Sequence, residues 1–252
     1  CSDESINQTD VAQPVLLTAG VALYRAIGCP AGIMAGHSLG EYIALTCAGA
    51  VDFEDALHLV TLRGKLMHEA KVQGCMGMIC GLSYESIMSM YSSTVEVATI
   101  NSPTRISIAG TVQHVTDVAD DAVMMGATWS DIWRDTLPFH SSLMQPIVDE
   151  FKEAVNAVHF EVPTWSSVVS NVTGEIYTGA SEIKINLVKH LTKPVQWAKC
   201  VQTIKNSGIS NYLEIGAKSI LARLILENDP NSVIVGIHDK ETMDKYCIER
   251  NI

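Results

Sequence analysis

The stretch Gly36-His37-Ser38-Leu39-Gly40-Glu41-Tyr42 decides the fold and points to the chemistry. An apolar run, 31–35, precedes it and a helix-like run, 42–48, follows it. A Gly-x-Ser-x-Gly pattern between a strand and a helix is typical of the nucleophile elbow, which presents a strained serine at the top of a sheet. We expect both glycines to be required, because a Cβ at either flank would clash across the turn. The alternative interpretation is a glycine-rich connection with an incidental serine.

The composition limits the class of protein. The 252-residue chain is 47% hydrophobic and 18% charged, which is typical of a globular protein with a substantial core. Its net charge of −11 argues against a nucleic-acid partner. No apolar run approaches the roughly 20 residues of a membrane span, and no signal segment opens the chain. Seven cysteines without paired spacing fit free thiols in a reducing compartment, so we expect a cytoplasmic protein.

Helical and strand patterns alternate through most of the chain. The alternation predicts an α/β layer fold with a mainly parallel sheet. The expected helices are 11–27, 42–48, 53–70, 140–158, 182–191, 195–206 and a segment that ends near residue 227. The expected strands are 31–35, 165–170, 211–215 and 233–237. With the elbow, this pattern indicates an α/β-hydrolase-like core.

A different pattern interrupts the core between residues 74 and 133. Its elements follow the order β-α-β-β-α-β, which is the ferredoxin-like pattern. The expected strands are 76–80, 95–100, 105–109 and 128–133, and the expected helices are 84–90 and 112–125. We therefore divide the chain into a discontinuous core, 1–73 and 134–252, and an inserted ferredoxin-like subdomain, 74–133.

A serine hydroxyl needs a neighbouring base before it can act as a nucleophile. His140 stands at the start of a predicted helix after the insertion, and His238 follows the last predicted strand, beside Asp239. In α/β-hydrolases the histidine comes late in the chain, which favours His238, but spacing alone does not choose between the two. His37 is expected to point away from Ser38, because neighbouring side chains diverge at the elbow.

Arg63 lies on the predicted helix 53–70. If its guanidinium faces the active cleft, it could bind a carboxylate with two parallel hydrogen bonds. The alternative is a solvated arginine on the helix surface.

Seven segments, taken in order, resemble the malonyl-CoA:acyl carrier protein transacylases, a family that includes the acyltransferase domains of polyketide and fatty acid synthases. The matches run from about residue 13 to residue 221. The segments are Gln13-Pro14-Val15-Leu16-Leu17, the elbow, Arg63-Gly64-Lys65-Leu66-Met67, Asn101-Ser102-Pro103, Phe139-His140-Ser141, Pro194-Val195-Gln196-Trp197 and Glu214-Ile215-Gly216.

The resemblance implies a serine–histidine dyad. Ser38 would be the nucleophile and His140 the base, so that His238 becomes a minor candidate. A backbone carbonyl orients the histidine in this family, and the matching position is near His190, where the family commonly has Gln. Arg63 would pair with the free carboxylate of the malonyl group.

The resemblance also implies a set of substrate contacts. Phe139 resembles the malonyl-selective form of its motif, and His37 and Asn101 are expected to bind substrate, Asn101 from a turn near the cleft. The N–H of Leu39 would serve in the oxyanion hole. The family has a second oxyanion donor on a Gly-Gln-Gly-Ser-Gln loop that is absent from this sequence. Because the chain also begins with Cys1, we expect it to lack an N-terminal segment of the full domain.

The expected activity follows from this resemblance. A malonyl group would move from malonyl-CoA to the phosphopantetheine thiol of an acyl carrier protein, through an acyl-serine intermediate and without a metal or resident cofactor. The compartment would be the cytoplasm or an organelle with fatty acid synthesis. One alternative is a hydrolase that clears acyl groups from the carrier, and another is an inactive, truncated domain that docks the carrier.

Overall fold

The elbow strand β1 (Ile33–Met34) is short and pairs in parallel with β6 (Ser167–Val168). A second parallel pair joins β7 (Asn211–Ile215) to β8 (Val233–Ile237). The computed structural model describes residues 8–91 and 93–250. The α/β fold class and the parallel strand direction predicted from the sequence are confirmed. Both β1 and β6 are shorter than expected, because the chain leaves the ladder to form the elbow after β1 and an antiparallel bridge between Val169 and Ile176 after β6.

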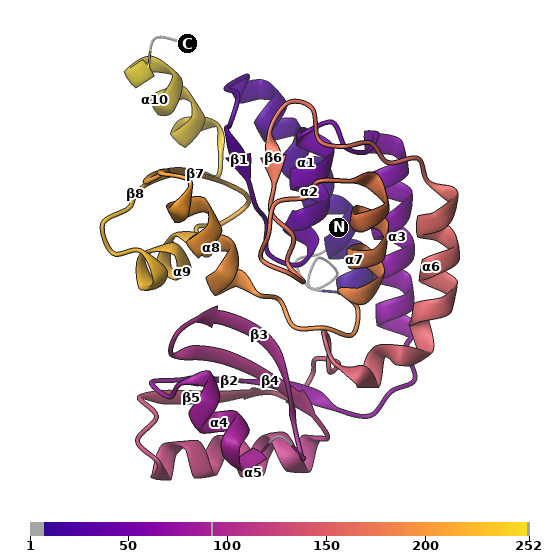
Figure 1. Ribbon diagram of the computed structural model, residues 1–252, viewed down its shortest axis with the longest axis vertical. Coiled ribbons are helices and arrows are strands. Elements are labelled where there is room, and N and C mark those ends of the chain that lie inside the picture. The colour runs from indigo at the N-terminus through magenta and orange to yellow at the C-terminus, as the bar shows by residue number, and fades with distance from the viewer. Residues whose placement is uncertain (1–7, 92, 251–252) are drawn as a thin grey trace.

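Helices surround these parallel strands (Figure 1). Helix α1 packs along α3 and also contacts α2, and the core between the helices includes Leu17, Leu45, Val60 and Phe151, all fully buried. The terminal helix α10 was not predicted from the sequence. No helix within residues 8–91 and 93–250 has the length and apolar character that a membrane crossing requires. The helices are α1 (Thr9–Ile27), α2 (Leu39–Cys47), α3 (Phe53–Glu69), α6 (Val148–Ala157), α7 (Ala180–Lys189), α8 (Trp197–Asn206), α9 (Leu221–Asn228) and α10 (Lys240–Arg250).

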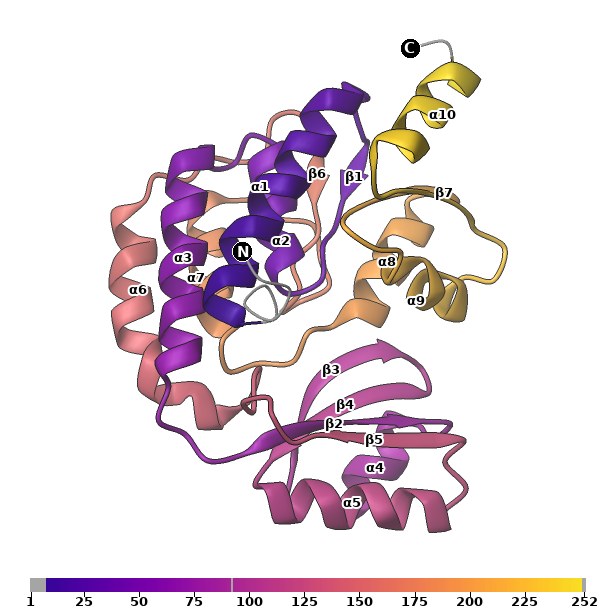
Figure 2. The same cartoon turned by 180° about the vertical axis from the view of Figure 1, so that it is seen from behind.

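The interruption forms a four-stranded antiparallel sheet in the order β3-β4-β2-β5. Helices α4 and α5 cover the face of this sheet that is turned away from the rest of the molecule (Figures 1 and 2). The ferredoxin-like pattern is thus confirmed, whereas the division into domains at residues 73/74 and 133/134 stays a prediction. The elements are β2 (Cys75–Cys80), α4 (Tyr84–Tyr91), β3 (Glu96–Ser102), β4 (Arg105–Gly110), α5 (Val112–Met124) and β5 (Trp129–Trp133).

Strand β3 joins the small sheet to the core. The N–H of Ile100 donates to the carbonyl of Val195 at 2.8 Å, and the N–H of Val195 donates to the carbonyl of Ala98 at 2.9 Å. On β4, Arg105 forms an ion pair with Glu227 of α9 at 2.8 Å. These contacts fix the end of β3 beside the elbow.

The helix expected over 140–158 is wrong in its first half. His140 has a positive φ of 58°, residues Ser142–Ile147 form a 3₁₀ helix, and α6 begins only at Val148. The Ser141 hydroxyl donates to the Pro138 carbonyl, and the Ser142 N–H donates to the Glu96 carboxylate. These bonds hold the start of the segment away from a helical path and leave His140 on a tight turn.

Candidate active site

The turn between β1 and α2 has the geometry of a nucleophile elbow. Ser38 has φ 53° and ψ −107°, a strained conformation for a residue with a Cβ. A Cβ on Gly36 would lie 2.0 Å from the backbone of Gly40, so the prediction that Gly36 must be glycine is supported. The same expectation for Gly40 is wrong, because a Cβ there would meet no heavy atom within 4 Å. A side chain on Gly36 would clash with the backbone of Gly40, whereas a side chain on Gly40 would point into open space.

Ser38 and His140 lie within hydrogen-bond distance, although 102 positions separate them in sequence. Ser38 Oγ is 3.0 Å from His140 Nε2, and His140 Nδ1 is 2.7 Å from the main-chain oxygen of His190. A carbonyl oxygen only accepts hydrogen bonds, so Nδ1 carries the proton and Nε2 presents its lone pair. The Ser38 hydroxyl therefore donates to His140 Nε2, as a nucleophile donates to its base.

The surroundings of His140 keep its imidazole neutral. Burial lowers the pKa of His140 from 6.5 to about 3, and the positive charge of Arg63 acts in the same direction. The backbone hydrogen bond to His190 opposes this shift. A neutral imidazole near pH 7 is the form that can accept a proton from Ser38.

Arg63 is buried beside Ser38, so the alternative of a solvated surface arginine is wrong. Its side chain is 2% exposed, and Nη2 donates to Ser38 Oγ at 3.1 Å. Nη1 donates to Oε1 of Gln13 at 2.7 Å, and the guanidinium lies over the Tyr42 ring. Its buried Nε has no hydrogen-bond partner in the described part of the chain. A fixed positive charge thus lies next to the hydroxyl that would carry the acyl group.

Asn171 also holds the elbow, a role that the sequence motifs did not predict. Its Oδ1 accepts from the N–H of Ser38 at 2.8 Å, and its Nδ2 donates to the carbonyl of Gly36 at 2.7 Å. The position of Asn171 contained a usable signal. It follows the predicted strand 165–170, and the carboxyl ends of parallel strands meet at one edge of a sheet.

The sequence motifs contain two buried polar side chains whose role the motifs alone do not indicate. Gln13 is 4% exposed and accepts from Arg63. Glu41 is fully buried on α2. The spacing of the motifs does not predict that Gln13 and Glu41 are buried.

The side chain of His37 lies against Asn101. His37 Nε2 is 2.9 Å from Asn101 Oδ1, and Asn101 Nδ2 donates to the Thr99 hydroxyl at 2.9 Å. Asn101 lies within β3 rather than in the expected turn, because the strand extends to Ser102 and pairs there with β4. The small sheet thus places a polar side chain against the elbow.

The remaining predicted residues lie at three different places. Leu39 is the first residue of α2, where an N–H has no acceptor within its own helix. Phe139 is partly buried and packs against the core between the helices and against a buried cluster of the four-stranded sheet. His238 does not join the dyad, because its Nδ1 contacts the carbonyl of Gly216 at 3.0 Å. The described residues include no group of three or more His, Cys, Asp or Glu arranged to hold a metal ion.

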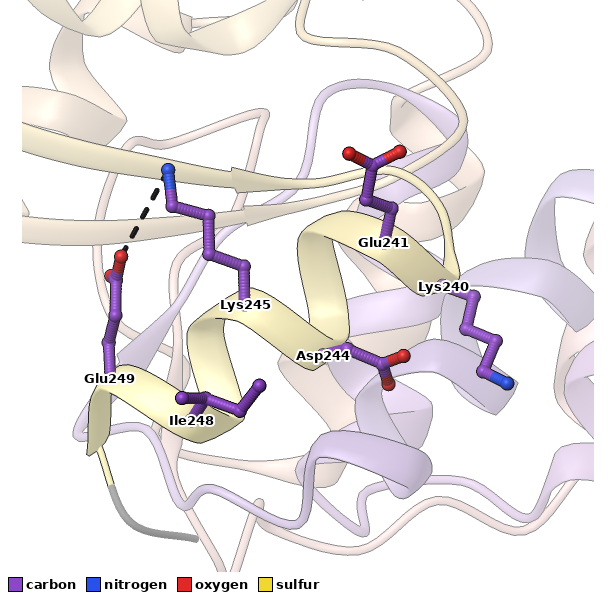
Figure 3. A pocket seen from close by; sticks show the side chains of 6 residues that line it. All are labelled: Lys240, Glu241, Asp244, Lys245, Ile248 and Glu249. Atoms are coloured by element: carbon purple, nitrogen blue, oxygen red, sulfur yellow. Dashed lines mark ion pairs between the residues drawn. The ribbon is translucent and has the colours of Figure 1, made fainter.

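Two hollows lie outside this cluster. The larger one, in Figure 3, is lined only by side chains of α10, among them the pair Lys245 and Glu249, and by none of the candidate residues. The smaller one has a volume of about 200 Å³ and lies where β3, α4 and residues 192–196 meet.

Comparison with known proteins identifies the family. The family model described as the acyl transferase domain matches residues 2–245. The chain belongs to the acyl transferase domain family. A relative of this acyl transferase, the malonyl CoA-acyl carrier protein transacylase of Salmonella typhimurium, is 38% identical over 232 residues, which cover 88% of this chain and 75% of that protein. The resemblance predicted from the motifs is thus confirmed.

Solved structures agree with this assignment. The malonyl CoA-acyl carrier protein transacylase of Coxiella burnetii matches this acyl transferase with a TM-score of 0.92 and 36% identity, over 97% of this chain and 81% of the other. A second match comes from a type II polyketide synthase acyl-carrier protein in complex with its malonyl-transacylase. Its TM-score is 0.92 and its identity 34%, over 99% of this chain and 84% of the other.

Proposed function

We propose that this acyl transferase moves a malonyl group from malonyl-CoA to the phosphopantetheine thiol of an acyl carrier protein. One observation carries the proposal. Ser38 Oγ lies between the base nitrogen of His140, at 3.0 Å, and the guanidinium of Arg63, at 3.1 Å. The relatives named as malonyl transacylases, and the relative that forms a complex with a carrier protein, support the choice of substrates.

In the first half-reaction, Ser38 Oγ attacks the thioester carbonyl of malonyl-CoA while its proton passes to Nε2 of His140. The tetrahedral oxyanion accepts a hydrogen bond from the N–H of Leu39, at the positive end of the α2 dipole. The carbon–sulfur bond then breaks, and the CoA sulfur takes the proton from His140. The product is a malonyl ester of Ser38.

Arg63 selects for the free carboxylate of the malonyl group. Its Nη2, which donates to Ser38 Oγ in the free enzyme, would donate to the carboxylate in the acyl-enzyme, and its buried unpartnered Nε gives a second donor. Gln13 holds Nη1 and limits the rotation of the guanidinium. An acyl group without a carboxylate would leave this buried charge unpaired.

In the second half-reaction, the phosphopantetheine thiol attacks the ester carbonyl. Neutral His140 accepts the thiol proton and returns it to Ser38 Oγ as the ester bond breaks. We place His37, Asn101 and Phe139 along the path of the incoming groups. Thiol must reach the ester before water does, and the attachment of β3 to residue 195 supports a narrow approach.

The same proposal places the reaction in a reducing compartment such as the cytoplasm. The free state of the six described cysteines supports this choice.

The division of the chain into a core and a subdomain at residues 74–133 is also part of the proposal. The four-stranded sheet within that range supports it.

The test is acylation of the enzyme with radiolabelled malonyl-CoA. We expect label on wild type and on a control, Ser207→Ala, which removes an exposed serine, and no label on Ser38→Ala. Addition of phosphopantetheine-loaded carrier protein should move the label to the carrier faster than water releases it as malonate. Label on Ser38→Ala would contradict the nucleophile, and faster release to water would identify a hydrolase instead.

A further inference from the structure

Glu41 is a buried carboxyl group that the mechanism above does not use. It lies on α2, three residues after Ser38, and is 0% exposed. Its Oε1 accepts a hydrogen bond from the Tyr177 hydroxyl at 2.7 Å and from the main-chain N–H of Asn171 at 3.1 Å. Its Oε2 is 3.3 Å from Nδ1 of His190. Burial of a carboxyl group costs free energy unless polar contacts compensate, and these three contacts provide that compensation for Glu41.

One of these contacts leads to the nucleophile. The main chain of Asn171 is held by Glu41, and the side chain of Asn171 binds the N–H of Ser38 and the carbonyl of Gly36. Both atoms belong to the elbow whose backbone is strained at Ser38. A shift of Glu41 would therefore move the residue that brackets the nucleophile.

Another contact leads to the base. The main-chain oxygen of His190 orients Nδ1 of His140, and the imidazole rings of these two residues are 4.7 Å apart. The His190 ring is fully buried, and neither of its nitrogens makes a hydrogen bond within the described residues. Oε2 of Glu41 lies 3.3 Å from Nδ1 of this ring and also makes no hydrogen bond there. The His190 ring, which lies beside His140, is thus in contact with the carboxyl group of Glu41.

We infer that Glu41 is a positioning residue that fixes the distance between Ser38 Oγ and His140 Nε2, through Asn171 on one side and His190 on the other. The inference rests on the proposed function, because that function makes Ser38 and His140 the reacting groups. Ser38 is the residue directly before α2 and Glu41 lies in the first turn of α2, so the helix links the nucleophile to the positioning residue.

Both protonation forms of Glu41 can maintain these contacts. Burial raises the pKa of Glu41 from 4.5 to about 7, against the hydrogen bonds from Tyr177 and Asn171 and the charge of Arg63. In either form Oε1 accepts the hydrogen bonds from Tyr177 and Asn171, and Oε2 lies 3.3 Å from Nδ1 of His190 as a polar contact. The positioning role therefore depends on hydrogen bonding rather than on charge.

Two substitutions of Glu41 separate the effect of its hydrogen bonds from the effect of its side-chain size. Glu41→Gln keeps the shape, an oxygen acceptor for Asn171 and Tyr177, and a polar atom beside Nδ1 of His190. Glu41→Met keeps the length and removes all three contacts. Leu45→Ala is the matched control, because it removes buried volume from α2 one turn further along, at a fully buried position whose side chain has no hydrogen-bonding group.

The experiment measures single-turnover acylation of the full chain by labelled malonyl-CoA, together with the melting temperature of each variant. We expect Glu41→Met to lower the acylation rate at saturating malonyl-CoA by about 100-fold, in the range of a lost general-base step, with the half-saturating concentration changed by less than about threefold. Glu41→Gln should keep at least about a third of the wild-type rate, because the hydrogen bonds remain.

Three outcomes would overturn the inference. They are a wild-type rate in Glu41→Met, a loss in Glu41→Gln as large as in Glu41→Met, and a loss in Leu45→Ala that matches Glu41→Met at equal melting temperature. Wild type and Ser38→Ala are measured in the same series. Failure of wild type to acquire label at all would refute the proposed function, which is a different result from any of these three.

Discussion

The main-chain carbonyl of His190 accepts a hydrogen bond from Nδ1 of His140 at 2.7 Å, at the place where a serine–histidine–aspartate site has a carboxylate. The carbonyl fixes the tautomer of the base as a carboxylate would. It carries no full negative charge, so it stabilises the imidazolium less. Burial and Arg63 then act with little opposition, and the base stays neutral over a wide range of pH.

The pH dependence of acylation follows from this arrangement. Only neutral His140 can accept the Ser38 proton, and its pKa is lowered to about 3. At pH 5 a base with a pKa of 3 is about 99% neutral, whereas one with the ordinary value of 6.5 is about 3% neutral. We therefore expect the single-turnover acylation rate to stay nearly constant from pH 8 down to about pH 5.

The pH profile of acylation should also be measured for Glu41→Gln. The pKa of Glu41 is raised to about 7, within the range tested, and the variant removes this second titrating group. A decline with a midpoint near pH 6.5 in both proteins would contradict the low pKa of His140.

Arg63 should decide which acyl group is accepted. Loss of a hydrogen bond to a charged group costs about 1.5–3 kcal/mol, so Arg63→Met should reduce labelling by malonyl-CoA by about 10- to 100-fold. Acetyl-CoA has no free carboxylate, and its transfer should fall much less. The matched control is Lys65→Met, which removes an exposed cation from the same helix. An equal loss with both acyl groups would show that Arg63 serves the fold or Ser38 instead of the carboxylate.

The two glycines of the elbow should differ in their tolerance of a methyl group. Gly36→Ala forces a Cβ to within 2.0 Å of the backbone of Gly40, which cannot move as a side chain could. We expect a loss of about 3 kcal/mol or more in the free energy of unfolding. Gly40→Ala meets open space on a helix and should be neutral or stabilising by up to about 1 kcal/mol. Urea unfolding measures both, and similar losses in the two variants would contradict the observed contact.

Asn171 should contribute to both stability and rate. Asn171→Ala leaves the N–H of Ser38 and the carbonyl of Gly36 without their partners, at about 1–3 kcal/mol for each buried group. Acylation should slow as well, because the strained elbow loses its support. Asn156→Ala, at an exposed position of α6, is the control. Urea unfolding and labelling together test the prediction, which fails if Asn171→Ala behaves like the control.

Local patterns in the sequence predicted much of this molecule. The order of the four strands and two helices between residues 74 and 133 follows from alternation and turn residues, and the elbow follows from its Gly-x-Ser-x-Gly pattern. Spacing alone did not choose between His140 and His238, because 102 positions separate Ser38 from His140 and local patterns do not report such contacts. The resemblance to a family supplied that choice.

Other features depend on packing and were not predictable from local patterns. The positive φ of His140 depends on the hydrogen bonds that the next two residues, Ser141 and Ser142, donate to Pro138 and Glu96. The burial of Glu41 depends on Tyr177, more than 100 residues away in sequence. A charged residue in a helical pattern is normally expected at the surface, so the pattern alone gives the wrong location.

The attachment of β3 to Val195 has a further consequence, for the solubility of the small sheet. β3 is an edge strand, and its main-chain N–H and C=O groups near Ala98 and Ile100 are paired with Val195. An unpaired edge is a template for association with other chains. Residues 74–133 expressed alone would lose this pairing and expose an apolar strand edge, so the core acts as a cap against aggregation of the sheet it carries.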